Sequence, residues 1–465
     1  MTIFRQYDIR GIADKELDNQ TTWALGKAIA ELLKEQNESS IYLGQDVRAS
    51  SPRLIAALRA GLVSSGIKVC VLKPGPTPLL YFITHQNHSS TTSKSGVMIT
   101  GSHNPPEYNG FKMVINGKTI YGDEIQVDLK KRTEKYISQS PKNFEETFEQ
   151  IDCESLYIDY VSKNIRPLKN KIKVVVDAGN GAASSLAPKV YERLGCTVIP
   201  LFCEFDSSFP NHHPDPTIPE NLEHLIEKVK ETGAHLGIAY DGDGDRIGAV
   251  TSNGKIMFGD QLLLYFSREI VKEVSNPIVI SEVKSSQVVY DELTKMGAQA
   301  ICWKTGHSLI KAKLKETHAA IAGEMSGHMF FSHRFFGFDD AIYSGARLIE
   351  GLDKNLPESL DSFLDSLPKV TNTPELRIDC PDEIKFSIVS KFILEAKNQF
   401  GKDVLDIDGA RIALFGGWGL LRASNTQPVL VMRFEASNKE NLQKIRNAFA
   451  SILEKIDPSI NVPLV

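Results

Sequence analysis

The chain has 465 residues, of which 42% are hydrophobic and 24% are charged, a balance typical of globular proteins. This length exceeds what one hydrophobic core supports, so the sequence predicts three or four domains. The net charge of −5 and the lack of a basic block argue against nucleic acid as the main partner.

The sequence shows neither a secretion signal at its start nor an apolar run of about 18 residues. We therefore expect no membrane partner and a cytoplasmic location. The six cysteines form no C-x-x-C pair and no zinc-ligand spacing, which predicts reduced thiols.

One pattern occurs three times: an apolar run, a turn, a helix-like segment closed by glycine, and a second apolar run. Continuous Val/Ile runs that alternate with helices are typical of βαβ units. The closing glycines are Gly66, Gly195 and Gly297, at positions where helices often end. The sequence therefore predicts three related α/β domains with mixed, largely parallel sheets.

The pattern changes after Leu367-Pro368. A strand at 375–379 precedes a long helix at 382–400, then short strands, then a last helix from about Asn438. This order predicts a C-terminal α+β domain of about a hundred residues.

Two other features mark domain boundaries. Residues 140–165 are predicted to be a polar loop and helix, and the Asn253-Gly254 turn is predicted to close the strand pair 236–240 and 247–250. The predicted domains are residues 1–150, 151–254, 255–368 and 369–465.

The strongest chemical signal is the run DGDGDR at 241–246. Asp241, Asp243 and Asp245 alternate with glycine at the end of an apolar strand. Three carboxylates this close repel one another unless a cation is present, and oxygen ligands suit Mg²⁺ or Ca²⁺. Arg246 and Ser252 occupy the places where an EF-hand needs Gly and Glu, which excludes that motif. The alternative is a solvated acidic turn.

Ser102 is expected at the exposed tip of a loop between two buried strands, 96–99 and 111–115. It could be an ordinary turn residue, or a nucleophile activated by His103, although the chain has no G-x-S-x-G motif. The aspartates add a third interpretation. A divalent cation could bridge their carboxylates and an oxygen on Ser102, and would polarise phosphorus if that oxygen belonged to a phosphoryl group.

Two further stretches could bind a sugar phosphate. At 422–426, Arg422, Ser424, Asn425 and Thr426 precede a strand and have the groups of a phosphate clamp. At 324–328, Glu324, Ser326 and His328 alternate, so on an extended segment they would point the same way, toward sugar hydroxyls. Either stretch could also be only a polar turn.

A possible dinucleotide motif is weak. Gly179 and Gly181 follow an apolar strand and Glu204 lies near the distance of a ribose-binding acid. However, Ser184 replaces the third glycine, which disfavours a nicotinamide site.

The sequence resembles the α-D-phosphohexomutase superfamily, and within it bacterial phosphomannomutase/phosphoglucomutase, in five motifs that keep their order and spacing. The motifs are YDIRG (7–11), TGSHNPPEYNGFK (100–112), DGDGDR (241–246), GEMSGH (323–328) and RASNTQP (422–428). The likeness covers nearly the whole chain, through stretches at 209–222, 303–317 and 335–344.

The resemblance implies four domains around a central cleft, each contributing one loop. It implies that Ser102 is a phosphoserine and that Mg²⁺ is bound by this phosphate with Asp241, Asp243 and Asp245. The implied catalytic residues are Ser102, Lys112, Arg10 and Arg246. The implied substrate-binding residues are Tyr7, Lys284, His307, Glu324, Met325, Ser326, Gly327, His328, Arg422, Ala423, Ser424, Asn425 and Thr426.

The implied reaction is reversible phosphoryl transfer between O1 and O6 of mannose or glucose phosphates. Glucose or mannose 1,6-bisphosphate would be the intermediate and activator. Lys112 or a nearby histidine could transfer the proton, Lys112 only if its pKa is lowered. We expect hexose phosphates as partners and a monomeric protein.

Three alternatives stay open. Phosphoglucosamine mutases usually carry S-A-S-H-N-P and R-P-S-G-T-E-P loops, which this chain lacks. A metal-dependent phosphohydrolase would use water in place of the sugar hydroxyl. A sugar-phosphate-binding protein would not need the intact serine and aspartates.

Overall fold

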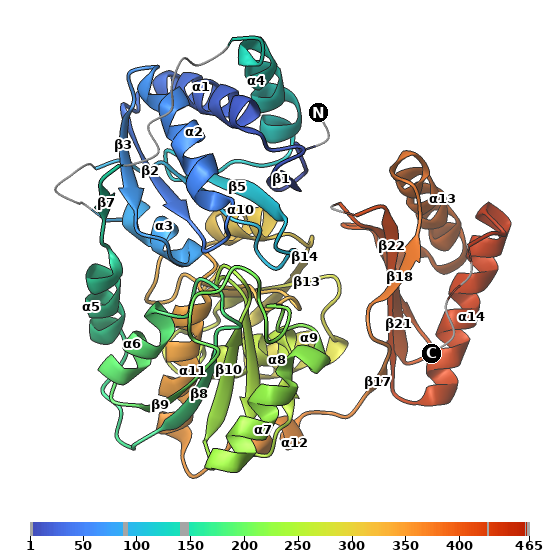
Figure 1. Cartoon of the computed structure of the whole chain (residues 1–465). Helices are drawn as coiled ribbons and strands as arrows, with labels where there is room; N and C mark the ends of the chain where they lie inside the picture. Colours follow the sequence, from blue (N-terminus) through green and yellow to red (C-terminus); the bar gives the residue numbers. More distant parts are fainter. Residues whose placement is uncertain (1–2, 87–91, 140–147, 426, 461, 463–465) are drawn as a thin grey trace.

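The structure, a computed structural model, describes residues 3–86, 92–139, 148–425, 427–460 and 462. Its strands form four sheets, and successive parts of the chain build them (Figure 1). The first three sheets are mixed and the fourth is antiparallel. The predicted class, three α/β domains followed by an α+β domain, is confirmed. We call these parts the first to fourth units.

The first unit has a seven-stranded sheet with the order β1-β5-β4-β2-β3-β7, and β6 pairs with β5. Strand β2 is parallel to β3 and β4, whereas β5 is antiparallel to β1 and β4. The strands are β1 (Ile9–Ile12), β2 (Ser40–Gln45), β3 (Lys68–Leu72), β4 (Gly96–Ile99), β5 (Tyr108–Ile115), β6 (Lys118–Thr119) and β7 (Gln150–Ile151). The helices are α1 (Asn19–Glu35), α2 (Ser51–Val63), α3 (Thr77–Thr84), the π-helix η1 (Glu124–Leu129) and α4 (Lys130–Tyr136).

Helices α1 and α2 approach closely where each has a glycine. A Cβ at Gly26 would lie 2.3 Å from the Leu58 carbonyl oxygen, and a Cβ at Gly61 would lie 2.2 Å from that of Trp23. Both glycines are therefore needed for this close helix pair.

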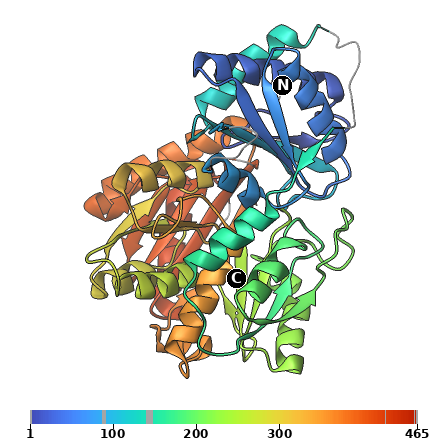
Figure 2. The same ribbon diagram turned by 90° about the vertical axis from the view of Figure 1, so that its left-hand side faces the viewer.

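The second unit has the sheet order β12-β11-β10-β8-β9, in which β8 is parallel to β9 and β10. The strands are β8 (Lys173–Asp177), β9 (Thr197–Leu201), β10 (Leu236–Tyr240), β11 (Ile247–Thr251) and β12 (Ile256–Met257). The helices are α5 (Glu154–Asn164), α6 (Leu186–Arg193), the 3₁₀-helix η2 (Pro219–Leu222) and α7 (Glu223–Thr232). Helix α5 packs against α3 of the first unit and α6 of the second, and Figure 2 shows it crossing between them.

The third unit has the sheet order β14-β13-β15-β16, with β13 parallel to β14 and β15 and with β16 antiparallel to β15. The strands are β13 (Ile278–Glu282), β14 (Gln299–Trp303), β15 (Ile321–Gly323) and β16 (Met329–Phe331). The helices are α8 (Gly259–Ile270), α9 (Gln287–Lys295), α10 (His307–Thr317), α11 (Ala341–Asn355) and α12 (Leu360–Ser366).

The fourth unit has the sheet order β17-β22-β21-β20-β19, and β18 also pairs with β22. The strands are β17 (Thr371–Asn372), β18 (Leu376–Asp379), β19 (Val404–Leu405), β20 (Ala410–Leu414), β21 (Gly417–Ala423) and β22 (Val429–Ala436). The helices are α13 (Asp382–Phe400), the 3₁₀-helix η3 (Gly401–Asp403) and α14 (Lys439–Ile456). The predicted helix at 382–400 is confirmed, and Asn438 caps α14 by accepting from Asn441 N.

The hydrophobic cores divide the chain unevenly. One continuous cluster includes Tyr42 of the first unit, Ile238 of the second and Met329 of the third. The fourth unit has its own cluster around Phe392 and Phe449. Figure 1 shows an extended connection from α12 to β17, beyond which the fourth unit lies to one side. The fourth unit is therefore the part that is least integrated into the common core.

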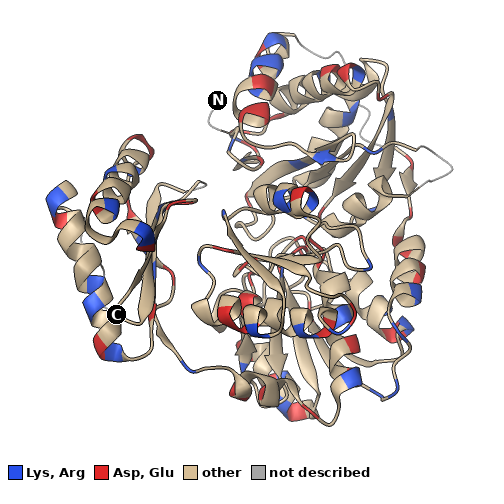
Figure 3. Cartoon of the chain, turned by 180° about the vertical axis from the view of Figure 1, so that it is seen from behind, with Lys and Arg blue, Asp and Glu red and all other residues tan. Residues whose placement is uncertain are grey.

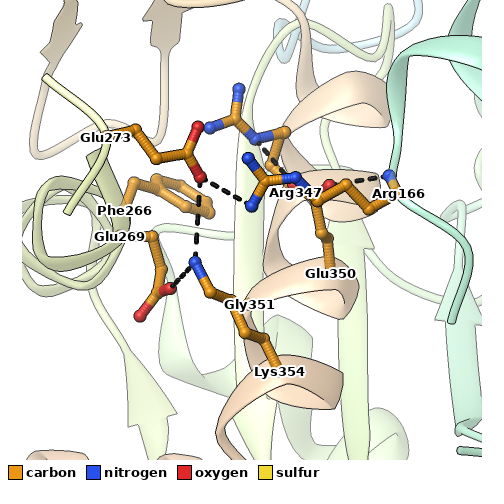
Figure 4. Close-up of a pocket in the computed structure, with 8 residues that line it drawn as sticks. All are labelled: Arg166, Phe266, Glu269, Glu273, Arg347, Glu350, Gly351 and Lys354. Atoms are coloured by element: carbon orange, nitrogen blue, oxygen red, sulfur yellow. Dashed lines mark hydrogen bonds and ion pairs between the residues drawn. The ribbon is translucent and has the colours of Figure 1, made fainter. Parts of the chain in front are cut away.

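A cluster of ion pairs joins the second and third units (Figure 4). Arg166, just after α5, pairs with Glu273 at 2.8 Å, and its backbone N–H donates to Glu350 of α11 at 2.7 Å. Lys354 pairs with Glu269 of α8 at 3.1 Å. The cavity that these residues line is about 10 Å³, room for about one water, so the cluster is a structural contact and not a ligand pocket.

One local prediction fits and another is wrong. Gly66, Gly195 and Gly297 have φ of +80°, +94° and +83°, as expected for residues that end helices. However, the Asn253-Gly254 turn joins β11 to β12, and the acidic loop 241–246 closes the β10–β11 hairpin. The pattern of apolar residues did not show which turn joins β10 to β11 and which joins β11 to β12.

The surface and the cysteines agree with the composition. Figure 3 shows Lys and Arg interspersed with Asp and Glu on the outer helices. All six cysteines are free thiols. Within the described part of the chain, none of the helices has the length and apolarity that crossing a membrane would require.

Candidate active site

Ser102 lies in the loop between β4 and β5, and the structure corrects its expected exposure. Only 2% of the residue is exposed. The second unit's loop 241–246 covers it: a Cβ at Gly242 would lie 2.3 Å from the Ser102 carbonyl oxygen. The local sequence could not show that a loop from another unit buries this tip.

The Ser102 hydroxyl faces an acid from the second unit. Its Oγ donates to Asp241 Oδ2 at 2.9 Å, and His103 Nδ1 lies 3.3 Å from Ser102 Oγ. The Ser102 backbone has φ of +49°, a left-handed conformation that non-glycine residues rarely adopt and that often marks functional positions. Burial lowers the pKa of His103 well below its usual value, helped by Arg246, so this histidine is neutral.

Arg48 fixes the backbone of the Ser102 loop, and the sequence analysis did not identify it. Its guanidinium is buried and donates to four carbonyl oxygens, those of Ser102 (2.8 Å), Asn104 (2.6 Å), Pro105 (2.5 Å) and Tyr108 (3.0 Å). Asp46 accepts from Arg48 Nε at 3.2 Å and from Gly101 N at 3.1 Å. A Cβ at Gly101 would lie 2.4 Å from Arg48 Cζ, so glycine here makes room for the guanidinium.

Sheet topology is the signal that could have found Asp46 and Arg48. They follow β2, and Ser102 follows β4, its parallel neighbour. Because the carboxyl ends of parallel strands meet at one edge of a sheet, polar residues after both strands are expected to be close.

Asp241, Asp243 and Asp245 form a fully buried triad in the loop after β10. Their ligand oxygens lie within 4.8 Å of one another, a spacing that could hold a metal ion. Burial, and then Asp243 and Asp245, raise the pKa of Asp241 well above its usual value. Asp243 Oδ1 and Asp245 Oδ1 are buried and have no hydrogen-bond partner among the residues that the structure describes. Hard oxygen donors that lack a partner fit a divalent cation such as Mg²⁺.

Lys112 of β5 lies beside the triad. Its Nζ donates to Asp243 Oδ2 at 2.7 Å and also to Asp245 Oδ2. Burial alone would lower the pKa of Lys112, but Asp243 and Asp245 outweigh it and raise the pKa well above its usual value. Proton transfer by Lys112 would need a lowered pKa, so this direction of the shift disfavours that role.

The segment 324–328 is a turn between β15 and β16, so the extended geometry under which its alternate side chains would point the same way does not apply. Glu324 N donates to His328 O at 3.0 Å, and Gly327 N donates to Glu324 O at 3.0 Å. Gly327 has φ of +90°, which lets the chain reverse. Glu324 and His328 are buried, whereas Met325 and Ser326 are half-buried.

This turn contacts the acidic loop at 241–246 and the strand that follows it directly. Ile247 N donates to Gly327 O at 3.1 Å, and Arg246 Nε donates to His328 Nε2 at 3.0 Å. His328 Nδ1 lies 3.5 Å from Asp245 Oδ1 and 3.3 Å from Asp339 Oδ2. The structure thus brings together Ser102, Lys112, the triad, Arg246 and His328.

Tyr7 and the fourth unit's loop form a second group of contacts. Asn425 Nδ2 donates to the Tyr7 hydroxyl at 2.6 Å, and Arg422 at the end of β21 pairs with Asp408 at 3.1 Å. Ala423 is the last residue of β21, directly after Arg422. Ser424 Oγ accepts from Gln427 N at 3.2 Å. The predicted site residue Thr426 lies outside the described residues.

Three other predicted site residues each have an acidic side chain nearby. Arg10 pairs with Asp8 at 2.6 Å. His307 Nδ1 lies 3.7 Å from Asp339 Oδ2. Lys284 Nζ lies 3.2 Å from Glu375 Oε2, at the start of the fourth unit.

The weak dinucleotide motif does not open a helix in the structure. Helix α6 begins at Leu186, beyond Gly179 and Gly181. Asp177, at the end of β8, instead contacts His212 Nε2 with both carboxylate oxygens at 3.1 Å. This geometry differs from a glycine turn that leads directly into a helix N-terminus.

Comparisons with known proteins match the whole chain. Family models described as phosphoglucomutase/phosphomannomutase alpha/beta/alpha domains I, II and III match residues 1–140, 155–254 and 258–370. The C-terminal domain of the same family matches residues 375–452.

Individual relatives agree with these matches. The chain is 44% identical over 463 residues to a phosphomannomutase/phosphoglucomutase of Pseudomonas putida, covering 99% of this chain and 97% of the relative. It is 31% identical to a phosphoglucosamine mutase of Methanococcus vannielii, covering 95% and 97%. A crystal structure of a phosphoglucomutase/phosphomannomutase family protein from Burkholderia thailandensis has a TM-score of 0.91 and 40% identity, and the match covers 99% of each chain.

Proposed function

Because this chain belongs to the phosphoglucomutase/phosphomannomutase family, we propose that Ser102 carries the phosphoryl group that its reaction moves. The chain is a mutase, an isomerase that transfers phosphoryl groups between hexose 1- and 6-phosphates. The observation that supports this role for Ser102 is its buried Oγ, 2.9 Å from Asp241 in an acidic triad. A phosphoryl group on Ser102 would lie beside these carboxylates.

Asp241, Asp243 and Asp245 would hold Mg²⁺ together with the Ser102 phosphate. The bound cation would offset the charge on the phosphoryl group and polarise it. The domain roles follow the loops: residues 1–150 supply Ser102, 151–254 the metal loop, 255–368 the sugar loop and 369–465 the phosphate loop.

Two cationic residues would stabilise the phosphoryl group as it moves. Lys112 is buried beside Asp243 and Asp245, which raise its pKa, and as a cation it would bind a phosphoryl oxygen directly. Arg246, the last residue of the same acidic loop, has its Nε 3.9 Å from Asp241 Oδ2. Arg10 would add a third positive charge at this end of the site. Because phosphoryl transfer needs mainly positioning and electrostatic stabilisation, these charges account for the catalytic part of the site.

The substrate would lie between the turn at 324–328, which we call the sugar turn, and the phosphate loop at 422–426. Glu324, with Met325, Ser326 and Gly327, would bind the sugar hydroxyls near His328. The remaining substrate-binding residues would be Tyr7, Lys284, His307, Arg422, Ala423, Ser424, Asn425 and Thr426. A 1,6-bisphosphate intermediate would turn over between two transfers, since one clamp must accept either phosphate.

A coupled assay tests the proposed substrates. It compares mannose 1-phosphate, glucose 1-phosphate and glucosamine 1-phosphate, with and without Mg²⁺, started with a trace of glucose 1,6-bisphosphate. We expect Mg²⁺-dependent 6-phosphate formation from mannose or glucose 1-phosphate. A clear preference for glucosamine 1-phosphate would favour the phosphoglucosamine alternative, and release of inorganic phosphate without 6-phosphate would favour a phosphohydrolase. We further propose that the enzyme is cytoplasmic and monomeric. A measurement of its mass in solution tests whether it is monomeric.

A further inference from the structure

The Thr305-Gly306 turn, just before α10, contacts substrate-loop residues from three units. The Thr305 carbonyl oxygen accepts from the Tyr7 hydroxyl of the first unit at 2.9 Å. Thr305 N donates to Asp408 Oδ2 of the fourth unit at 3.0 Å. Gly306 N donates to Glu324 Oε1 of the sugar turn at 2.6 Å. A single backbone turn therefore connects all three loops.

Asp408 is the fourth unit's part of this junction, and it also holds Arg422. Its Oδ2 accepts from Arg422 Nε at 3.1 Å, and its Oδ1 accepts from Nη2 at 3.4 Å. The Arg422 side chain is 6% exposed and that of Asp408 is 14% exposed. A planar guanidinium held at one edge by a carboxylate has a fixed orientation, and its remaining N–H donors can bind a phosphate.

The loop that begins at Arg422 is tied to the same turn at a second point. Asn425 Nδ2 donates to the Tyr7 hydroxyl, which in turn donates to Thr305 O. Arg422 through Asp408, and Asn425 through Tyr7, thus meet at Thr305. The two links form a closed ring that sets both the position of the loop and the direction of its arginine.

The weak integration of the fourth unit makes this ring important. Its apolar contact with the third unit is a small cluster of Val283, Trp418 and Leu420 with Cys302 and Ile407. The separate core of the fourth unit permits it to move relative to the rest, so polar contacts determine where its phosphate loop lies. They include this ring and the hydrogen bonds that Arg411 and Arg433 donate to carbonyl oxygens of the third unit.

We propose that Asp408 is a positioning residue that couples the Arg422 phosphate loop to the Thr305-Gly306 turn and so sets the affinity for the substrate's distal phosphate. This inference rests on the proposed function. Asp408 acts through Arg422 and Thr305 and does not touch the reacting atoms. Its loss therefore weakens substrate binding and leaves the chemistry at Ser102 in place.

The variant D408N tests this role in the whole enzyme with glucose 1-phosphate and mannose 1-phosphate as substrates. The amide keeps the size of the side chain but removes the charge that holds Arg422. We expect KM to rise by about tenfold or more, as for a lost charge-assisted hydrogen bond, while kcat stays close to the wild-type value. D408E, which keeps the carboxylate, should recover part of the KM loss.

D406N is the matched control. Asp406 lies two positions away and forms an exposed ion pair with Lys397, outside the ring. The melting temperature of each variant shows whether it is folded. If D408N is destabilised, the KM of D408E alone is compared with that of the wild type. An unchanged KM in D408N would overturn the proposal, and so would a lower KM, which would mean that the carboxylate competes with phosphate. An equal rise in D406N would also overturn it. A wild-type enzyme without mutase activity would instead overturn the proposed function.

Discussion

The hydroxyl of Ser102 donates a 2.9 Å hydrogen bond to Asp241, which lies 139 positions later in the chain. The contact joins the first and second units, and it exists because Gly242 has no side chain to push the two loops apart. This contact supports the proposal that the serine carries a phosphoryl group next to a bound cation. Several measurable consequences follow from it and from its surroundings.

Mg²⁺ should stabilise the wild-type protein and be required for its activity. A cation relieves the repulsion among Asp241, Asp243 and Asp245, so a concentration of about 100 times Kd adds about 2.7 kcal/mol to the free energy of unfolding. The measurement is the melting temperature with a chelator and with Mg²⁺. D243N should lose the Mg²⁺ shift, whereas the exposed D206N should keep it. An equal shift in D243N would place the cation elsewhere.

Arg48→Met should slow phosphoryl transfer and destabilise the protein. The change leaves Asp46 and four carbonyl oxygens without their buried cation, a loss on the order of 3–5 kcal/mol. R48K should restore little, because an ammonium cannot span four carbonyl oxygens. Stopped-flow measurement of Ser102 phosphorylation and chemical denaturation give the two readouts.

Arg53→Met is the control for Arg48. Arg53 also binds carbonyl oxygens, those of Ala13 and Leu17, but away from Ser102. It should lower stability without changing the transfer rate. If R48M retains the wild-type transfer rate, Arg48 does not position the Ser102 loop.

Glu350→Ala should destabilise the protein without changing kcat. In the cluster of Figure 4, Glu350 binds Arg347 at 3.3 Å, and it also binds the half-buried Arg334 at 2.9 Å. Its removal leaves the buried Arg347 without its carboxylate partner, at a cost on the order of 3–5 kcal/mol. Urea denaturation measures this loss. E358A removes the more exposed pair with Arg268 and should cost about 1 kcal/mol or less. Similar losses in both variants would show that burial of the cluster has no energetic effect.

The Lys284–Glu375 ion pair should make stability depend on acid pH. Lys284, with a smaller effect from Arg377, lowers the pKa of Glu375 from 4.5 to about 2, against an opposing effect of burial. Since the folded pKa is the lower one, the contribution is complete above pH 4.5 and disappears as the pH falls through about 2. At neutral pH it amounts to about 3 kcal/mol.

The test compares unfolding free energies of the wild type and Glu375→Gln from pH 7 to pH 2. The difference should be largest at neutral pH and shrink below about pH 4. Glu383→Gln, at an exposed position on α13, should show a small difference at every pH. A difference for E375Q that does not change with pH would contradict the assignment.

Much of the fold could be predicted because its signals are local. The helix at 382–400 and the Asn438 cap follow from periodicity and capping chemistry, and the glycines that end helices follow from φ. The acidic triad was equally visible, because its members are two residues apart in one strand-ending loop.

Contacts between units could not be read in the same way. The burial of Ser102 depends on Gly242 of another unit, and the turn at Glu324–His328 depends on the pairing of β15 with β16. Asp408 and Arg48 look like ordinary polar turn residues in the sequence. Their partners come from other parts of the chain, so only the structure shows what they hold.

The most direct test of the central claim is the site of phosphoryl transfer. The protein is incubated with ³²P-labelled glucose 1,6-bisphosphate and Mg²⁺, digested, and the labelled peptide is identified by mass spectrometry. We predict a single label on Ser102 that is chased by unlabelled glucose 1-phosphate, and none in S102A, whose turnover should fall by ~10³-fold or more. Label on a different residue, or undiminished isomerisation by S102A, would contradict the account.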